Sequence, residues 1–114
     1  MKLSVVKEIL EANVLVGDDN LDVEVLFGAA GDLMSDLLRH PMKDAILLTG
    51  LINIQSVRTC VIAGMNEIVF VRGKTPSSEI ISYAEEHTVP LLSTPYNMYT
   101  SCGKLFKNRL KSIR

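Results

Sequence analysis

The sequence predicts a three-layer α/β domain, in which a mostly parallel sheet of about five strands carries helices on both faces. Three observations predict this fold. Apolar residues recur alternately at helical spacing and in short strand-like runs along the chain. The connections between these segments are short, which implies right-handed strand–helix–strand crossovers. Residues 45–49 (AILLT) form an almost wholly apolar run, as is typical of a strand covered on both faces.

The size and composition suit one domain spanning residues 1–114. A chain of 114 residues can bury about two-thirds of the surface it exposes when unfolded. The hydrophobic fraction is 47%, but aromatic residues make up only 5% and Trp is absent. We therefore expect a core built from Leu, Ile, Val, Ala and Met.

Before the central strand, the pattern predicts two helices and two strands. The first helix follows from apolar residues at helical spacing, and the strands fall over residues 13–16 and 23–29, separated by a turn at 17–20. Gly28 to Gly31 form a small-residue corner, after which Asp32 is placed to cap the second helix. That helix is expected to end at His40-Pro41. The buried residues expected on these helices are Leu3, Val6, Ile9 and Leu10, then Leu33, Met34, Leu37 and Leu38.

After the central strand, the alternation continues to the end of the chain. Ile54, Val57 and Val61, with Arg58 and Ile62 beside them, predict a helix that stops at Gly64. Residues 67–71 predict a strand. Ser77 or Ser78 begins the next helix, and residues 89–92 form the last predicted strand. A final helix is predicted to bury one apolar seam, made of Tyr99, Cys102, Phe106, Leu110 and Ile113.

The distribution of charged and apolar residues indicates which binding partners and which cellular location to expect for the protein. Residues 87–114 contain five basic residues and no acidic one, although the net charge is only −1. This basic end fits either an anionic partner or, as we prefer, a helix dipole and a solvated face. Five charges are few for nucleic-acid binding. No apolar run approaches the ~20 residues that span a bilayer, and no signal peptide opens the sequence, so we expect a cytoplasmic protein without membrane contact.

The two cysteines, Cys60 and Cys102, are few for a secreted scaffold and form no Cys-x-x-Cys motif. We expect free, buried thiols, with a disulfide between them as the alternative.

Polar and Gly-rich segments follow four of the predicted strands. In an open α/β sheet, ligands bind in the crevice at the carboxyl ends of the strands. Two loop cations beside a glycine could hold a phosphate, and small residues allow backbone amides to approach a ligand. The predicted ligand-binding residues are Gly28, Gly31, Asp32, Thr49, Gly50, Asn53, Arg72, Gly73, Lys74, Ser93 and Thr94.

Catalytic and metal chemistry find little support in the sequence. It contains no phosphate-binding P-loop, no dinucleotide fingerprint and no Gly-x-Ser-x-Gly nucleophile motif. Asp32 and Asp36 could share a proton or a metal, but no further ligand lies near them in sequence. His40 and His87 stand alone at predicted helix ends. We therefore expect no enzyme activity, no metal and no cofactor.

Four spaced blocks, at residues 28–36, 46–50, 67–74 and 90–100, together resemble a DRTGG domain. The resemblance implies a non-catalytic α/β module that pairs with its own copy. Such domains are accessory parts of larger enzymes, including phosphotransacetylases and pyrophosphatases regulated through CBS domains, and the amino-terminal domain of HPr kinase is similar. Asp32, Thr49, Gly50, Arg58 and Gly73 fall at positions where the resemblance implies importance. Gly50 is followed by Leu51-Ile52-Asn53 and not by a second Gly or an acidic–basic pair.

Two functions of different classes follow. The first is a regulatory module that senses a nucleotide or another small anion at the strand ends. The alternative is an assembly module, a homodimer or a domain that docks on a larger enzyme, which binds no small molecule. Its apolar surface would draw on Leu51, Ile52, Ile54, Met65 and Met98. A small enzyme is the least supported possibility.

Overall fold

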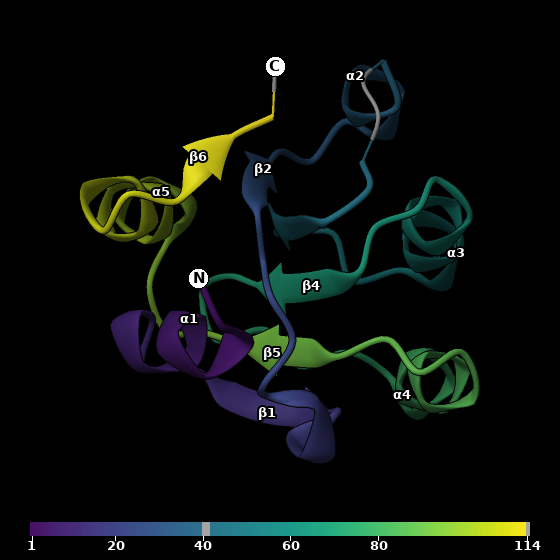
Figure 1. The fold of residues 1–114 in the computed structure, drawn as a ribbon. Helices are drawn as coiled ribbons and strands as arrows, with labels where there is room; N and C mark the ends of the chain where they lie inside the picture. Colours follow the sequence, from purple (N-terminus) through teal and green to yellow (C-terminus); the bar gives the residue numbers. More distant parts are fainter. Residues whose placement is uncertain (40–41, 114) are drawn as a thin grey trace.

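A six-stranded, mostly parallel sheet forms the middle layer of the molecule (Figure 1). The computed structural model describes residues 1–39 and 42–113. The strand order across the sheet is β1-β5-β4-β3-β2-β6. The strands are β1 (Asn13–Val16), β2 (Phe27–Ala30), β3 (Ala45–Thr49), β4 (Glu67–Phe70), β5 (Leu91–Ser93) and β6 (Lys111–Ser112). Every neighbouring pair is parallel except β1 and β5. The predicted three-layer α/β class is confirmed.

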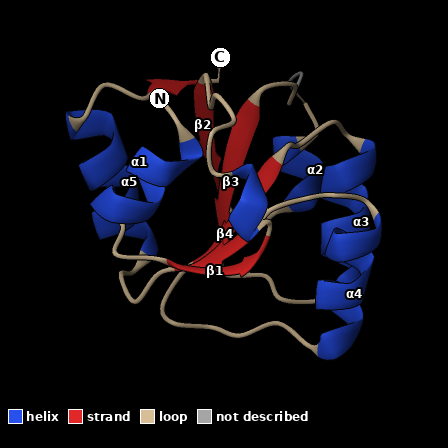
Figure 2. Ribbon diagram, turned by 60° about the horizontal axis from the view of Figure 1, so that its bottom comes forward, coloured by secondary structure: helices blue, strands red, loops and turns tan. Residues whose placement is uncertain are grey.

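Helices cover both faces of this sheet (Figure 2). One face carries α1 (Leu3–Ile9) and α5 (Met98–Lys107), and the other carries α2 (Met34–Leu37), α3 (Ile54–Ile62) and α4 (Ser78–Glu86). A short 3-10 turn, η1 (Asp18–Asn20), follows β1 at the predicted turn. Among the described residues, every helix is too short or too polar to cross a membrane.

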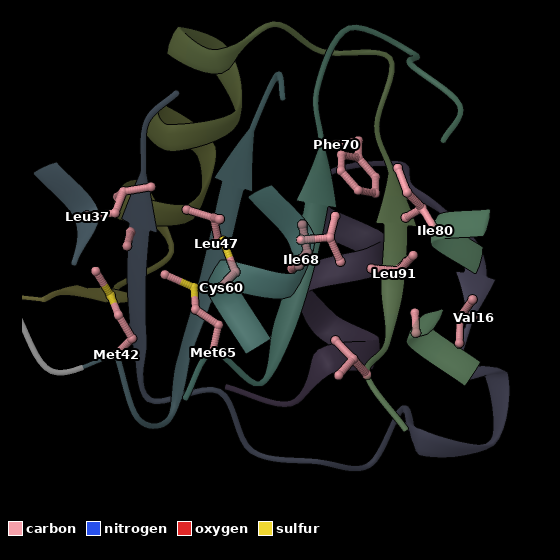
Figure 3. Packing of buried hydrophobic residues seen from close by; sticks show 14 residues of the cluster. Val16, Leu37, Met42, Leu47, Cys60, Met65, Ile68, Phe70, Ile80 and Leu91 are labelled. Atoms are coloured by element: carbon pink, nitrogen blue, oxygen red, sulfur yellow. The ribbon is translucent and has the colours of Figure 1, made fainter. Parts of the chain in front are cut away.

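Two apolar clusters hold the helices against the sheet, one on each face. The α3-face cluster includes Leu47, Cys60, Phe70, Ile80 and Leu91 (Figure 3). The α1-face cluster includes Leu3, Val6, Ile46, Leu48 and Leu105. Successive side chains of a strand point to opposite faces, so adjacent residues of β3 belong to different clusters. All five residues of β3 are buried, as the sequence predicted.

Side-chain caps begin three of the helices. Asn53, Ser77 and Asn97 each accept a hydrogen bond from the backbone N–H three residues ahead. These caps satisfy N–H groups that have no partner within the helix. Ser77, one of the two predicted starts, is therefore the residue before α4, and α3 ends next to Gly64, where φ is +97°.

The strand predicted over residues 23–29 is wrong at its start. β2 begins at Phe27, because the preceding residues pair with the amino terminus of the chain. Val25 N–H donates to the Met1 carbonyl at 2.7 Å, and Leu3 N–H donates to the Val23 carbonyl at 3.0 Å. Similarly, β5 begins two residues late, at Leu91 after Pro90, which has no N–H for the ladder.

The final predicted helix is wrong in length and in its buried face. α5 ends at Lys107, and the chain then turns through Arg109, where φ is +73°, to form β6, a strand that the sequence pattern did not reveal. Tyr99 is 88% exposed and Phe106 is 73% exposed, so this part of the predicted seam faces outward. Ser101 and Leu105 are the buried residues of α5.

The second predicted helix is shorter than expected. α2 spans four residues, and only Leu37 of its predicted stripe is fully buried, while Leu33 and Leu38 are exposed. The predicted helix end at residues 40–41 lies outside the described residues.

Both cysteines are free thiols. Cys60 belongs to the α3-face cluster, and Cys102 packs against the α1-face cluster on the other side of the sheet. The sheet therefore separates them, and the alternative of a disulfide between them is wrong. Burial raises the pKa of the Cys60 thiol to about 11, as is expected for a thiol packed in a core.

Candidate ligand site at the strand ends

Three loops meet around Gly50, at the carboxyl end of β3. A Cβ atom placed on Gly50 would lie 3.3 Å from Asp32 Oδ2 and 3.6 Å from Arg72 Nη2. Lys74 Nζ donates a hydrogen bond to the Gly50 carbonyl at 2.8 Å. Asp32 follows β2, while Arg72 and Lys74 follow β4, so the parallel strands deliver all these groups to one edge of the sheet. We call Asp32, Thr49, Gly50, Arg72 and Lys74 the strand-end cluster.

One carboxylate oxygen of Asp32 ties the first two loops together. Asp32 Oδ1 accepts a hydrogen bond from Thr49 Oγ1 at 3.0 Å and another from Gly50 N–H at 2.7 Å. The predicted role of Asp32 as a helix cap is wrong. The extended residue Leu33 separates it from α2 and makes no side-chain cap itself, so the Asp32 side chain reaches the neighbouring strand end instead.

The loop after β4 holds a cation in an unusual backbone conformation. Arg72 and Gly73 both adopt a left-handed backbone conformation, with φ angles of +61° and +67°. This conformation costs a non-glycine residue roughly 1–2 kcal/mol. Two hydrogen bonds stabilise it, from Arg72 N–H to the Tyr96 carbonyl at 2.8 Å and from Gly73 N–H to the Thr94 carbonyl at 2.7 Å. The Arg72 side chain is exposed, and no atom lies within 4 Å of a Cβ on Gly73, so the loop opens to solvent.

The other predicted ligand-binding residues lie outside the strand-end cluster. Gly28 lies inside β2 and not in a corner, and a Cβ there would come within 3.1 Å of Leu110. Gly31 continues the chain after β2, and Asn53 caps α3. Ser93 and Thr94 are buried and donate to the carbonyls of Lys74 and Leu10.

In the described part of the chain, the catalytic and metal-binding candidates Asp36 and His87 contact residues other than Asp32. Asp36 is exposed, 3.8 Å from Arg39, while Asp32 turns toward Gly50. His87 stacks on Tyr83 at the end of α4, and Nδ1 of its ring lies 2.9 Å from the Tyr83 carbonyl. His40 lies outside the described residues. The described part of the chain contains no group of three or more His, Cys, Asp or Glu side chains able to hold a metal ion.

Comparison with known proteins identifies the family. Residues 5–107 match the DRTGG domain. The chain belongs to the DRTGG domain family. A sequence search of curated proteins finds no match.

A solved structure shares the fold of this DRTGG domain. It is the regulatory region of a Clostridium perfringens pyrophosphatase, which contains CBS and DRTGG domains and was crystallised with its activator, diadenosine tetraphosphate. The TM-score is 0.74 at 14% sequence identity, and the match covers 98% of this chain but 50% of the other. This DRTGG domain thus corresponds to about half of that regulatory region, and the likeness shows the fold.

Sequence reasoning missed a polar group next to the strand-end cluster of this DRTGG domain. The Tyr96 hydroxyl donates a hydrogen bond to Glu11 Oε2, and this bond raises the pKa of the Tyr96 phenol. Lys104 Nζ lies 4.7 Å from the centre of the Tyr96 ring. The position of Tyr96, two residues beyond the predicted Thr94, was the available signal.

A buried carboxyl group at the opposite end of the sheet was also missed. Glu67, the first residue of β4, is only 3% exposed, and its Oε1 atom has no hydrogen-bond partner among the described residues. Burial, and secondarily the charge of Asp44, raise the pKa of Glu67 to about 7. Its place within the predicted apolar strand concealed it.

Proposed function

We propose that this DRTGG domain is a non-catalytic regulatory module that binds a small anion, such as a nucleotide, at the strand-end cluster. The observation that carries the proposal is the convergence of Asp32, Arg72 and Lys74 on Gly50. The exposed Arg72 guanidinium has five N–H donors in a geometry that matches phosphate. Lys74 Nζ uses one donor on Gly50 and has two more.

The regulatory region of the pyrophosphatase supports a nucleotide as the first candidate, because that region was crystallised with diadenosine tetraphosphate. The two free cysteines support a reducing, cytoplasmic location for the module.

A thermal-shift screen tests the proposal. We expect diadenosine tetraphosphate, ATP, AMP or acetyl phosphate to raise the melting temperature, because a ligand that binds only the folded state stabilises it, by ~2.7 kcal/mol at 100 times Kd. Arg72→Gln and Lys74→Gln should each weaken binding about tenfold, since each removes a charge-assisted hydrogen bond. Lys43→Gln, an exposed cation outside the cluster, is the matched control. No shift with any of these anions, or equal shifts in all variants, would refute the proposal.

A second candidate is the assembly module, which forms a homodimer or docks on a larger enzyme. Large apolar side chains on the α2–α3 side favour it, since Ile62 is 83% exposed and Leu33 is 64% exposed. Of the residues expected to contribute, Met65 is buried and Ile52 is exposed. Sedimentation velocity on the wild type and on Ile62→Ser tests this candidate. A dimer that dissociates in the variant would support it, and a wild-type protein that stays monomeric at a concentration of about 200 µM would refute the homodimer.

A further inference from the structure

Within residues 1–39 and 42–113, β6 covers only part of the sheet edge at β2. β6 pairs with Phe27 and Gly28, and the last hydrogen bond across this edge runs from Ile113 N–H to the Gly28 carbonyl. Phe27 and Gly31 direct their N–H groups to the β3 side of β2, at Asp44 and Leu48. Because backbone groups alternate along a strand, the N–H and carbonyl of Ala30 point outward.

Ala30 is exposed, and its N–H has no partner across this edge among residues 1–39 and 42–113. An unpaired strand edge of this kind is a template for another strand.

A groove of about 890 Å³ lies along this uncovered edge. Ala29 and Ala30 of β2 form part of its lining, together with side chains of α5 and with Leu37 of α2. Figure 1 shows β2 and β6 between α5 and α2. The exposed aromatic residues Tyr99 and Phe106 belong to the lining, so the outward half of the predicted seam faces this groove. We call it the α5–β2 groove.

The charges around the α5–β2 groove are mainly positive. Arg39, Lys104, Lys107 and Lys111 line it, and Asp36, which is 3.8 Å from Arg39, is the one acidic residue among the described residues of the lining. Most of the basic residues gathered near the carboxyl end of the sequence therefore border one apolar groove. An occupant with acidic groups is favoured by this arrangement.

We propose that an extended acidic segment of a partner protein adds to β2 in the α5–β2 groove as a further strand. The backbone of the segment pairs with Ala30, and its apolar side chains, at alternate positions, pack against Leu37 on the face that carries α2. The acidic side chains between them point to the opposite face and meet Lys104 and Lys107 of α5. Main-chain pairing supplies affinity in this mode of recognition, and the side-chain contacts supply specificity. This site is separate in its residues from the strand-end cluster, so each proposal can fail alone.

Selection from a random heptapeptide display library tests the proposal on the full chain. We expect the enriched peptides to be acidic, with apolar residues at alternate positions, and to bind in fluorescence polarisation. Gly103→Trp should weaken that binding at least tenfold, because Gly103 lines the groove and no atom lies within 4 Å of a Cβ there. Gly103→Ala is the matched control and should bind as the wild type does.

Two further measurements make the test independent of one variant. Lys107→Glu should weaken binding of the acidic peptides severalfold, because Lys107 is an exposed residue of the groove whose charge is reversed. Amide hydrogen exchange at Ala30 should slow at least tenfold when the peptide saturates the protein, because its outward N–H becomes hydrogen-bonded.

Four results would overturn the proposal. They are no enrichment of any peptide, enrichment without acidic residues, binding unchanged in both Gly103→Trp and Lys107→Glu, and unchanged exchange at Ala30. A dimer that Gly103→Trp dissociates would also overturn it, because a second copy would then occupy the groove.

Discussion

Asp32 connects two strand ends through a single oxygen atom. Its Oδ1 atom accepts from the Thr49 hydroxyl and from Gly50 N–H, and both donors belong to buried residues. A buried donor that loses its acceptor costs the full desolvation penalty of the group. The carboxylate is therefore structural as well as close to the proposed anion site.

Replacing Asp32 should reveal this structural role. We expect Asp32→Ala to lower the free energy of unfolding by about 1–3 kcal/mol, because two donors lose their acceptor. Asp32→Asn retains an acceptor oxygen and should lose less. Asp36→Ala, at an exposed neighbouring aspartate, should change stability by no more than about 0.5 kcal/mol. Urea denaturation of the three variants measures these differences, and equal losses in Asp32→Ala and Asp36→Ala would contradict the role.

Glu67 should make the stability of the protein depend on pH. Its pKa is about 7 in the folded protein and close to 4.5 when the chain is unfolded. Between these values the folded state retains a proton that the unfolded state has lost, so stability falls as pH rises. The contribution is complete below pH 4.5 and lost above pH 7, and a full shift of this size amounts to about 3 kcal/mol.

Glu67→Gln isolates this contribution, because glutamine does not titrate. Urea unfolding of both proteins from pH 4.5 to pH 8 should show the variant gaining about 2–3 kcal/mol relative to the wild type as pH rises. A difference that does not change with pH would mean that Glu67 has an ordinary pKa in the folded protein.

At the scale of helices and strands, two glycines should respond in opposite directions to the same substitution. Gly103 lies inside α5, where a Cβ meets no atom within 4 Å. Gly17 has a φ of +91°, and a Cβ there would lie 2.9 Å from the Pro90 Cβ. Gly103→Ala should raise stability by up to ~1 kcal/mol through helix propensity, and Gly17→Ala should lower it by at least ~1 kcal/mol. Thermal denaturation measures both, and a loss of stability in Gly103→Ala would contradict the open environment of that residue.

The sequence correctly predicted those helices and strands that are determined by residues close together in the chain. Period and caps place α3 and α4 correctly, and the apolar run over residues 45–49 correctly predicts the central strand. The parallel arrangement that follows from them correctly brings Arg72 and Lys74 to the end of β3. These features depend on spacing within about ten residues and on the handedness of strand–helix–strand connections.

Features that depend on distant partners were not predictable in this way. Residues 23–26 have the alternation of a strand but pair with Met1 and Leu3 at the amino terminus. Asp32 has the local signature of a cap, yet its partners lie 17 and 18 residues further along the chain. The apolar seam of α5 was assigned to the core, although Phe106 faces a groove at the surface. In each case, periodicity shows which residues share a face but not what that face contacts.

At the scale of the whole molecule, the sheet is the structure that the α3-face cluster and the α1-face cluster share. Leu47 and Leu48 are adjacent in β3 but belong to the α3-face and α1-face clusters respectively. If either cluster loses packing, the strand that supports the other is affected as well. We therefore expect the two layers to unfold as one cooperative unit, as is usual for domains of this size.

Leu47→Ala and Leu48→Ala test this cooperativity, one from each face of the sheet. Each should lower the free energy of unfolding by about 2–5 kcal/mol, because each removes buried methyl groups and leaves a cavity. Far-UV circular dichroism and tyrosine fluorescence should give coincident urea transitions in both variants, displaced to lower urea but with an unchanged slope. A second transition in either variant would show that the helices on one face can separate while the sheet and the opposite layer remain folded. Separation of either layer would then disturb the strand-end cluster. Arg72 and Gly73 donate hydrogen bonds to the loop that leads into α5 on one face. Asn53 and Ser77 begin α3 and α4 on the other face.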